Sequence, residues 1–523
     1  MRFVALVGAM GLALPCWAAP AFVFCAEAAP DGFDSALSDR AATHRAAAYP
    51  IYNRLVGYAP KTGALVPELA ERWEAGDEGR SWTFTLRHGV HFQKTPWFTP
   101  TRDFNADDVL WTALRQIDPH HPGAAEAPSG FADAIAGDWR GLIESVEKVD
   151  AYTVRFKLSR AYAPFPALVA SWPFSIVSAE YGVQLAKLGQ LAKMATEPVG
   201  TGPYQLTKYD PGSTIRYAAN PGYFRGTIAI AKLTFAIVPD SSVRAQKLRT
   251  GECSLAESLK PEDIASLQSS PAVAITRYRP QATSFLAFNT QHKPFGDSRV
   301  RRALSLAIDR RAIVSAVFAS HAGVGSAPYA ADSLWGAPKA NEASQDLQAA
   351  KRLLADAGYP NGFTTSIWVT QGGSSNNVNP KLTAELVQAD WAKLGVRAEI
   401  VPFDAAELGR RSRAGEHETV ISGWRNSIDP DELYANLLTC DAAKSSTARW
   451  CDPAFDRLIE AARGTLDQAA RSKRYEAAAA RFIEQAPWAV LAYPEAAIAS
   501  DRRLGGVEPS PAAPFAFDRL FWR

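Results

Sequence analysis

The sequence lacks a surplus of charge of either sign. Its 523 residues carry 56 lysines and arginines against 54 aspartates and glutamates, a formal net charge of +2. No basic block or acidic tail concentrates charge along the chain. Proteins that bind nucleic acids present a dense basic surface to phosphates, so we do not expect this class. The length predicts more than one domain.

The sequence also lacks the short motifs of common enzymes. It contains no GxSxG, HExxH, P-loop or GxGxxG pattern. Only 8 histidines occur, and the pairs His88/His91 and His120/His121 are more typical of solvated or structural histidines than of a metal site. We therefore expect no metal, no other cofactor and no catalysis, although paired catalytic carboxylates leave no reliable mark in a sequence.

Apolar runs long enough to span a membrane are missing too, and the one marked apolar run, at the N-terminus, is short. Arg2 precedes an apolar run over 3–14, and small residues lead to Ala18. This is the pattern of a secretory signal peptide, and the run is too short for a permanent membrane helix. Pro15 before Cys16 fits a lipoprotein cleavage box poorly. We therefore predict cleavage after Ala18 and a soluble periplasmic protein; a buried N-terminal helix or strand is the alternative.

Cysteine is scarce, with 5 in the chain, of which four remain once the leader with Cys16 is removed. An even number in an oxidising compartment suggests disulfides, and four cysteines permit three pairings. Cys440 and Cys451 are close in sequence and form the natural local pair, which leaves Cys25 for Cys253. Four buried free thiols are the alternative. A zinc site is disfavoured because no CxxC spacing exists.

Strand and helix patterns alternate along the chain. Residues 153–158 alternate apolar and polar, as a half-buried strand does. Apolar residues at helical spacing over 347–354 end near Gly358, and a second helical pattern over 382–394 ends at Gly395. The stretch 396–400 then reads as a strand. The order helix, glycine, strand predicts an α/β fold.

Several motifs in a fixed order resemble family 5 of the extracytoplasmic solute-binding proteins, which serve ABC importers of peptides and nickel. They are PELAERW at 67–73, WTFTLRHGVHF at 82–92, NADDV at 105–109, VGTGPY at 199–204, FNT at 288–290, VRRAL at 300–304 and DWAKLGV at 390–396. The resemblance covers the mature chain. It is greatest to the dipeptide-binding branch and the Sap-type branch linked to antimicrobial-peptide resistance.

The resemblance implies a two-lobed periplasmic-binding-protein fold of class II, cluster C type, with an extra subdomain inserted in the first lobe. Lobe I would comprise 19–280 and 497–523, lobe II would comprise 281–496, and crossover strands would join them near 280 and 496. The four mature cysteines match the family's two disulfides, Cys25–Cys253 and Cys440–Cys451. The implied protein is a monomer that binds di- or oligopeptides between its lobes and delivers them to an inner-membrane ABC permease.

The resemblance also implies ligand-binding residues. In the dipeptide branch an aspartate in a Gly-Trp loop holds the ligand ammonium, and Asp429 matches it, although the loop here is one residue shorter. The alternative is that Asp429 only starts the turn at Pro430. The other implied residues are Trp424, Asn426, Ser427 and Ile428 of the same loop, Asp39 and Arg40 near the N-terminus, and Ser374, Ser375 and Asn376 before the helix at 382–394.

One departure from the family concerns the opposite end of a peptide. The dipeptide branch has an arginine for the ligand carboxylate in the loop that corresponds to 371–380, but this loop contains no arginine or lysine before Pro380. We therefore predict that binding is not confined to dipeptides, and Arg40 and Arg425 are candidates for a substitute cation. The competing hypotheses are the same fold with haem, a metal chelate, an opine or a sugar as cargo, and a secreted hydrolase.

Overall fold

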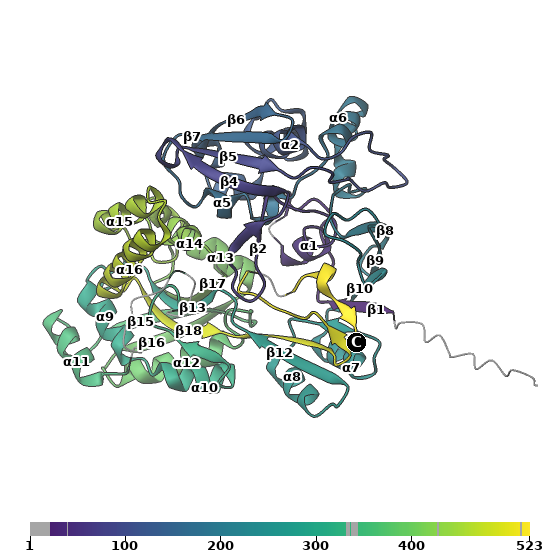
Figure 1. Cartoon of the computed structure of the whole chain (residues 1–523). Helices are drawn as coiled ribbons and strands as arrows, with labels where there is room; N and C mark the ends of the chain where they lie inside the picture. Colours follow the sequence, from purple (N-terminus) through teal and green to yellow (C-terminus); the bar gives the residue numbers. More distant parts are fainter. Residues whose placement is uncertain (1–20, 39, 331–334, 336–343, 426–427, 513–514) are drawn as a thin grey trace, which may run out of the picture.

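The structure is a computed structural model that describes residues 21–38, 40–330, 335, 344–425, 428–512 and 515–523. The predicted leader over 1–18 and the predicted ligand residues Asp39, Asn426 and Ser427 lie outside the described residues. The fold is mixed α/β with two lobes, each built on its own sheet, and a smaller subdomain that extends lobe I (Figure 1).

Lobe I contains a seven-stranded sheet. In spatial order its strands are β12 (Val273–Tyr278), β19 (Ala496–Asp501), β11 (Leu255–Ala256), β1 (Phe22–Ala26), β10 (Lys232–Ile237), β9 (Thr214–Ala219) and β8 (Tyr204–Asp210). Side chains of β1 alternate between two cores, with Phe22 and Phe24 in one and Cys25 in the other. The second core also contains residues of α7 (Ser241–Arg249) and α8 (Pro261–Gln268).

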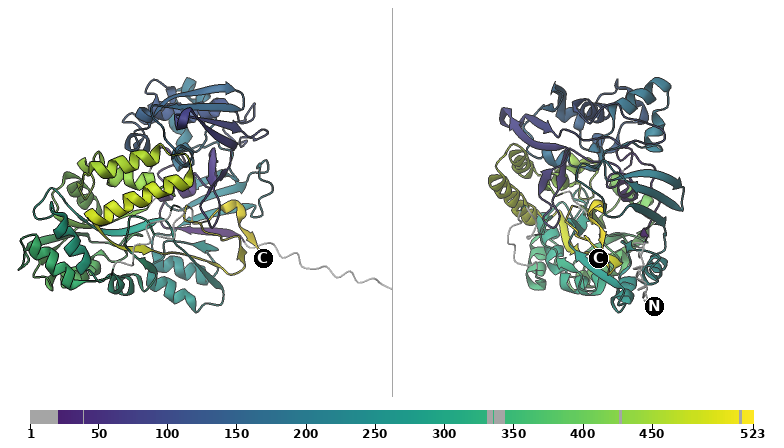
Figure 2. Two further views of the ribbon diagram at one scale, coloured as in Figure 1. Left: turned by 60° about the vertical axis from the view of Figure 1, so that its left-hand side comes forward. Right: turned by 45° about the vertical axis from the view of Figure 1, so that its right-hand side comes forward.

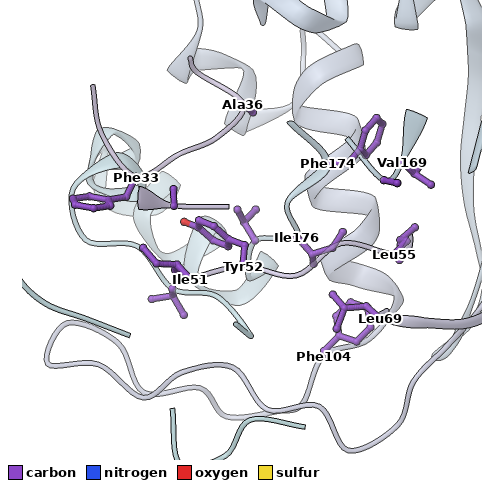
Figure 3. Packing of buried hydrophobic residues seen from close by; sticks show 14 of the residues in the cluster. Phe33, Ala36, Ile51, Tyr52, Leu55, Leu69, Phe104, Val169, Phe174 and Ile176 are labelled. Carbon is purple, nitrogen blue, oxygen red and sulfur yellow. The ribbon is translucent and has the colours of Figure 1, made fainter. Parts of the chain in front are cut away.

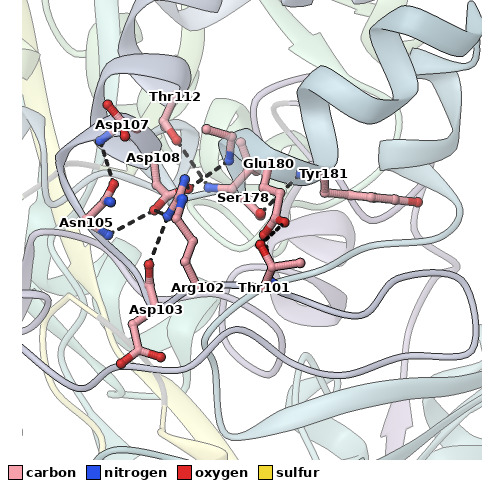
Figure 4. Close-up of polar contacts among 12 residues, drawn as sticks. Thr101, Arg102, Asp103, Asn105, Asp107, Asp108, Thr112, Ser178, Glu180 and Tyr181 are labelled. Carbon is pink, nitrogen blue, oxygen red and sulfur yellow. Dashed lines mark hydrogen bonds and ion pairs between the residues drawn. The ribbon is translucent and has the colours of Figure 1, made fainter.

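The inserted subdomain carries a four-stranded antiparallel sheet in the order β4 (Ala70–Gly76), β5 (Ser81–Leu86), β7 (Thr153–Leu158) and β6 (Ile143–Asp150). The NADDV motif starts its main helix, α2 (Ala106–Ile117), because Asn105 and Asp108 form a capping box. Asp108 also accepts two hydrogen bonds from Arg102, at 2.7 and 2.9 Å (Figure 4). This motif is therefore structural.

The VGTGPY motif is structural as well. A Cβ atom on Gly200 would lie 2.0 Å from the carbonyl oxygen of Ile51, and one on Gly202 would lie 2.5 Å from the carbonyl carbon of Ile51. Only glycine permits this close approach of two backbones. Ile51 and Tyr52 in turn lie within the apolar core of lobe I, which Figure 3 shows.

Lobe II is built on a six-stranded sheet. Its spatial order is β14 (Ala322–Val324), β18 (Trp488–Pro494), β13 (Ala282–Phe288), β17 (Thr419–Arg425), β15 (Thr364–Thr370) and β16 (Arg397–Phe403). Successive residues of β13 belong to opposite cores: Leu286 and Phe288 lie in one, Phe285 and Ala287 in the other. Both faces of the sheet are therefore buried.

Helices cover both faces of the lobe II sheet. One core contains residues of α9 (Ser298–Ala307), α10 (Arg310–Phe318), α11 (Leu347–Asp356) and α12 (Pro380–Ala392). The other contains residues of α13 (Ala405–Ala414), α14 (Pro430–Leu437), α15 (Pro453–Arg463) and α16 (Gln468–Gln485). Figure 2 shows α15 and α16, in yellow-green, side by side.

The remaining elements are short or belong to lobe I. Among them are the hairpin of β2 (Val56–Tyr58) and β3 (Leu65–Pro67), the pair β20 (Leu504–Gly505) and β21 (Phe521–Trp522), and the α-helices α1 (Ala41–Ala46), α3 (Ala132–Ala136), α4 (Trp139–Leu142), α5 (Phe165–Leu168) and α6 (Ala179–Leu188).

The local predictions agree with these elements, and the cysteine pairing is confirmed. The patterns at 153–158, 347–354, 382–394 and 396–400 correspond to β7, α11, α12 and β16. Cys25 and Cys253 are bonded with their Cα atoms 5.8 Å apart, and Cys440 and Cys451 with theirs 4.2 Å apart. No helix within the described ranges is long and apolar enough to cross a membrane.

Candidate ligand-binding site

The chain passes between the two sheets at two places. It leaves the lobe I sheet at Tyr278 and enters the lobe II sheet at Ala282, and it returns between Pro494 and Ala496. A cavity of about 230 Å³ lies at these crossings. Its walls combine the crossing segments with the β2–β3 hairpin and the C-terminal segment, and are formed by Lys61, Tyr278, Arg279, Pro280, Gln281, Ala282, Thr283, Ala330, Tyr493, Pro509, Ser510 and Pro511.

The predicted loop before α12 packs against β17. A Cβ atom on Gly423 would lie only 2.4 Å from the Cβ of Asn376, so Asn376 covers that glycine. Asn377 fixes the loop, because its amide nitrogen donates to Thr383 Oγ1 at 3.0 Å and to Ser284 Oγ at 3.3 Å. The structure therefore brings the Ser374–Asn376 segment against the strand that carries Trp424, although the two are far apart in sequence.

Two polar atoms of these segments are buried, and neither has a hydrogen-bond partner among the described residues. They are the Oδ1 of Asn376 and the indole Nε1 of Trp424. Enclosed polar groups in native proteins are normally paired, so each is suited to a polar ligand atom. Ser374 and Ser375, in contrast, are exposed.

Asp429 occupies a buried position, with 5% of its surface exposed. It is the N-cap of α14, and its Oδ1 accepts from the backbone N–H of Asp431. Both of its oxygens also accept from Arg471, at 2.7 Å each. Asp429 thus begins the helix at Pro430, as the structural alternative expected. Its role as an ammonium partner is untested and stays a prediction.

Sequence reasoning missed Arg471, the partner of Asp429. Arg471 lies on α16, donates to the hydroxyl of Tyr475 at 2.6 Å and has its guanidinium over the rings of Trp335 and Tyr475. Burial disfavours its charged form, but the Asp429 carboxylate and Tyr475 together outweigh that effect, so the pKa of Arg471 is raised. An ammonium that reached Asp429 would therefore join a pair that is already neutral.

The other predicted residues lie around the junction of the lobes. Ile428 is buried, and its Cδ1 would be 2.4 Å from a Cβ on Gly63 of the β2–β3 hairpin. Arg425 ends β17 as an exposed residue opposite Ala282. Arg40 is the N-cap residue of α1 and pairs with Asp31 at 2.6 Å, with both side chains about half exposed.

Lobe I contributes a buried ion pair that the sequence did not reveal. Arg45 of α1 pairs with Glu257, which follows β11. Burial raises the pKa of Glu257, against the opposing effects of Arg45 and Arg425. Because Arg425 belongs to lobe II, its electrostatic influence on Glu257 reaches from one lobe to the other. Among the residues that the structure describes, no group of three or more potential ligands could hold a metal ion.

Comparison with known proteins gives one consistent family. Residues 64–445 match the model for the bacterial extracellular solute-binding proteins, family 5 Middle. Di/tripeptide-binding protein 2 of Pseudomonas aeruginosa (strain UCBPP-PA14) is 39% identical over 500 residues, which cover 95% of this chain and 94% of that protein. Heme-binding protein A of Haemophilus influenzae is 37% identical over 506 residues, covering 96% and 91%.

A solved structure extends the likeness to the fold. The dipeptide binding protein from Pseudoalteromonas sp. SM9913, in complex with Met-Leu, superimposes with a TM-score of 0.83 at 32% identity. The match covers 96% of this chain and 100% of that one. The likeness therefore includes both lobes and the crossings between them.

Proposed function

The chain belongs to family 5 of the bacterial extracellular solute-binding proteins, and from this premise we propose that it captures short peptides in the periplasm for an ABC importer. The observation that carries the proposal is the 39% identity to a di/tripeptide-binding protein over 95% of this chain. We further propose that it is exported with cleavage after Ala18, acts as a monomer without catalysing a reaction, and delivers its ligand to an inner-membrane permease.

A peptide would bind between the lobes, and its charged ends would lose water as the lobes close. Each desolvated end then needs a partner. Asp429 is proposed for the ammonium, next to Arg471. Polar backbone atoms of the peptide have suitable partners in Asn376 and Trp424, whose buried atoms have none among the described residues. Backbone recognition of this kind is tolerant of peptide side chains.

Arg425 is our proposal for the carboxylate end. Side chains alternate along a strand, so Arg425 lies on the same face of β17 as Gly423, the residue that Asn376 covers. It is exposed, and its charge reaches Glu257 across the lobes. It therefore brings a positive charge close to the uncharged loop. We expect a cation at the end of β17 to restrict the length of the peptide less strictly than an arginine in the loop at 371–380 would.

Native mass spectrometry of protein purified without denaturation tests the proposal. A series of co-purified short-peptide masses is the expected result. Titration calorimetry with peptides of two to five residues should then show that the protein binds peptides longer than dipeptides as well. C-terminal amidation should weaken binding to the wild type and have less effect on Arg425→Gln. Failure to bind any free peptide would contradict the function, whereas tight binding of dipeptides alone would contradict only the proposed length range.

Haem is the second candidate cargo. The observation that favours it is the 37% identity to heme-binding protein A over 96% of this chain. A haem titration followed by absorbance distinguishes the two. A saturable Soret shift, together with no heat on adding peptides, would replace peptide by haem as the cargo.

A further inference from the structure

The two lobes also contact each other through residues outside the predicted ligand segments. On the lobe I side these residues are Tyr162 and Ala163, in the segment between β7 and α5. On the lobe II side they are Asp431, in the first turn of α14, and Arg463, the last residue of α15. Figure 1 shows α14 and α15 next to the inserted subdomain. We call these four residues the clasp.

Two hydrogen bonds of the clasp join the lobes. The hydroxyl of Tyr162 donates to Asp431 Oδ2 at 2.8 Å, and the backbone N–H of Ala163 donates to the carbonyl oxygen of Arg463 at 2.7 Å. A third bond lies within lobe II, where Arg463 Nε donates to Asp431 Oδ1 at 2.7 Å. Asp431 is 2% exposed, so its carboxylate depends on these partners in place of water.

The protonation states of the clasp suit these bonds. Burial raises the pKa of Tyr162 and the Asp431 carboxylate raises it further, so the hydroxyl keeps its proton. Burial acts against the charge of Arg463, but Asp431 and Tyr162 together outweigh it, so the pKa of that guanidinium is raised. The clasp is therefore a neutral donor on lobe I that meets a charged pair on lobe II.

Apolar contacts on either side extend the clasp. A Cβ atom on Gly79 of lobe I would lie 3.2 Å from Leu466 Cδ2, and a Cβ on Gly63 would lie 2.4 Å from Ile428 Cδ1. Ile428 and Leu466 both belong to lobe II. The surfaces of the lobes are thus fitted closely around the polar contacts, and water would replace these contacts if the lobes separated.

The clasp is connected to the predicted ligand segment through one turn of helix. The backbone N–H of Asp431 donates to Asp429 Oδ1 at 3.0 Å, so the proposed ammonium partner and the clasp carboxylate share the start of α14. We propose that the clasp stabilises the closed arrangement of the lobes without ligand, and that Tyr162 and Asp431 are positioning residues for ligand capture.

The mechanism is a shift of population. A ligand that needs the closed form binds more weakly when a smaller fraction of the protein is closed. Loss of the Tyr162 hydroxyl should lower the ratio of closed to open protein by about 10-fold, because a hydrogen bond to a buried charged group is removed. The resulting loss of affinity should be the same for every ligand, since Tyr162 contributes to closure of the lobes and makes no contact with the ligand.

Amide hydrogen exchange at Ala163 reports the clasp directly, because this N–H is donated across the lobes. In the unliganded wild type we expect this amide to be protected. In Tyr162→Phe it should exchange about 10-fold faster. Tyr152→Phe is the matched control, since Tyr152 lies in the same subdomain and stacks on His88, and it should exchange as the wild type does. An unprotected Ala163 amide in the wild type, or equal rates in wild type and Tyr162→Phe, would overturn the proposal.

Binding measurements form the second arm, and they rest on the proposed function. Calorimetry with Met-Leu and with N-acetylated Met-Leu should show equal losses of affinity for both probes in Tyr162→Phe. Unequal losses would mean that Tyr162 contacts the ligand, which contradicts a positioning role. If neither probe binds the wild type, the proposed peptide function is wrong. Amide hydrogen exchange at Ala163 then still tests whether the clasp holds the lobes together.

Discussion

Asp429 and Asp431 begin the same helix, two residues apart, yet they face different parts of the molecule. Asp429 is bound by Arg471 on both oxygens, and both residues belong to lobe II. Asp431 is bound by Arg463 of its own lobe and by Tyr162 of lobe I. The first pair persists whatever the lobes do, whereas the Tyr162 contact requires the lobes to meet. One turn of helix thus combines ion pairs within lobe II with a hydrogen bond that forms only when the lobes meet.

Replacing Arg471 should have the largest effect, because it leaves the Asp429 carboxylate buried without its partner. We expect Arg471→Met to lower the free energy of unfolding by about 3–5 kcal/mol. Urea denaturation followed by fluorescence measures this. The control is Arg474→Met on the same helix, where the side chain is exposed and its Nε donates to Thr465 Oγ1 at 2.9 Å. Equal stability of the two variants would show that the Asp429–Arg471 pair is not structural.

Asp429→Asn separates the two roles of that aspartate. As an ammonium partner, Asp429 should contribute about 2–5 kcal/mol to peptide binding. As the partner of Arg471, it should contribute to folding as well, so unfolding and binding must both be measured. A cycle of wild type and variant with free-amine and N-acetylated peptides isolates the ammonium contribution. If Asp429→Asn binds free-amine peptides as tightly as the wild type does, the ammonium role is wrong.

Gly63→Ala tests the contacts that form only when the lobes meet, through packing. Gly63 has φ +71°, and its added methyl group would meet Ile428 of the other lobe. We expect a loss of about 1–2 kcal/mol in ligand affinity from this overpacking. Gly89→Ala is the control, because Gly89 has φ +67° but nothing within 4 Å of its Cβ position. It carries the same backbone strain, so an equal loss of affinity in both variants would exclude an interlobe cause.

Arg40→Gln should have the smallest effect on stability. Its pair with Asp31 is about half exposed on both sides, unlike the buried pairs of Asp429 and Asp431. Exposed ion pairs contribute about 0–1 kcal/mol and are screened by salt. Urea denaturation at low and high salt should show little change. If Arg40→Gln lowers the free energy of unfolding as much as Arg471→Met does, solvent exposure does not determine how much these ion pairs contribute to stability.

Much of the fold was predictable because its signals are local. The alternation at 153–158 and the helical spacing at 347–354 each occupy a few neighbouring residues, and β7 and α11 form there. Cys440 and Cys451 are 11 residues apart, so their closeness in the sequence also indicated the pairing. For Cys25 and Cys253, 228 residues apart, the resemblance to the family supplied the additional support.

The amino-acid order by itself thus determined the alternation of helices and strands, the family and the segments in which ligand residues were expected. Only the tertiary structure decided which charges meet. Arg471 lies 42 residues beyond Asp429, and Tyr162 lies 269 residues before Asp431. Such contacts follow no period in the chain, because the distance between two side chains in space depends on how whole elements pack. For the same reason, NADDV and VGTGPY stood out as motifs, but only the packing showed that they support the fold.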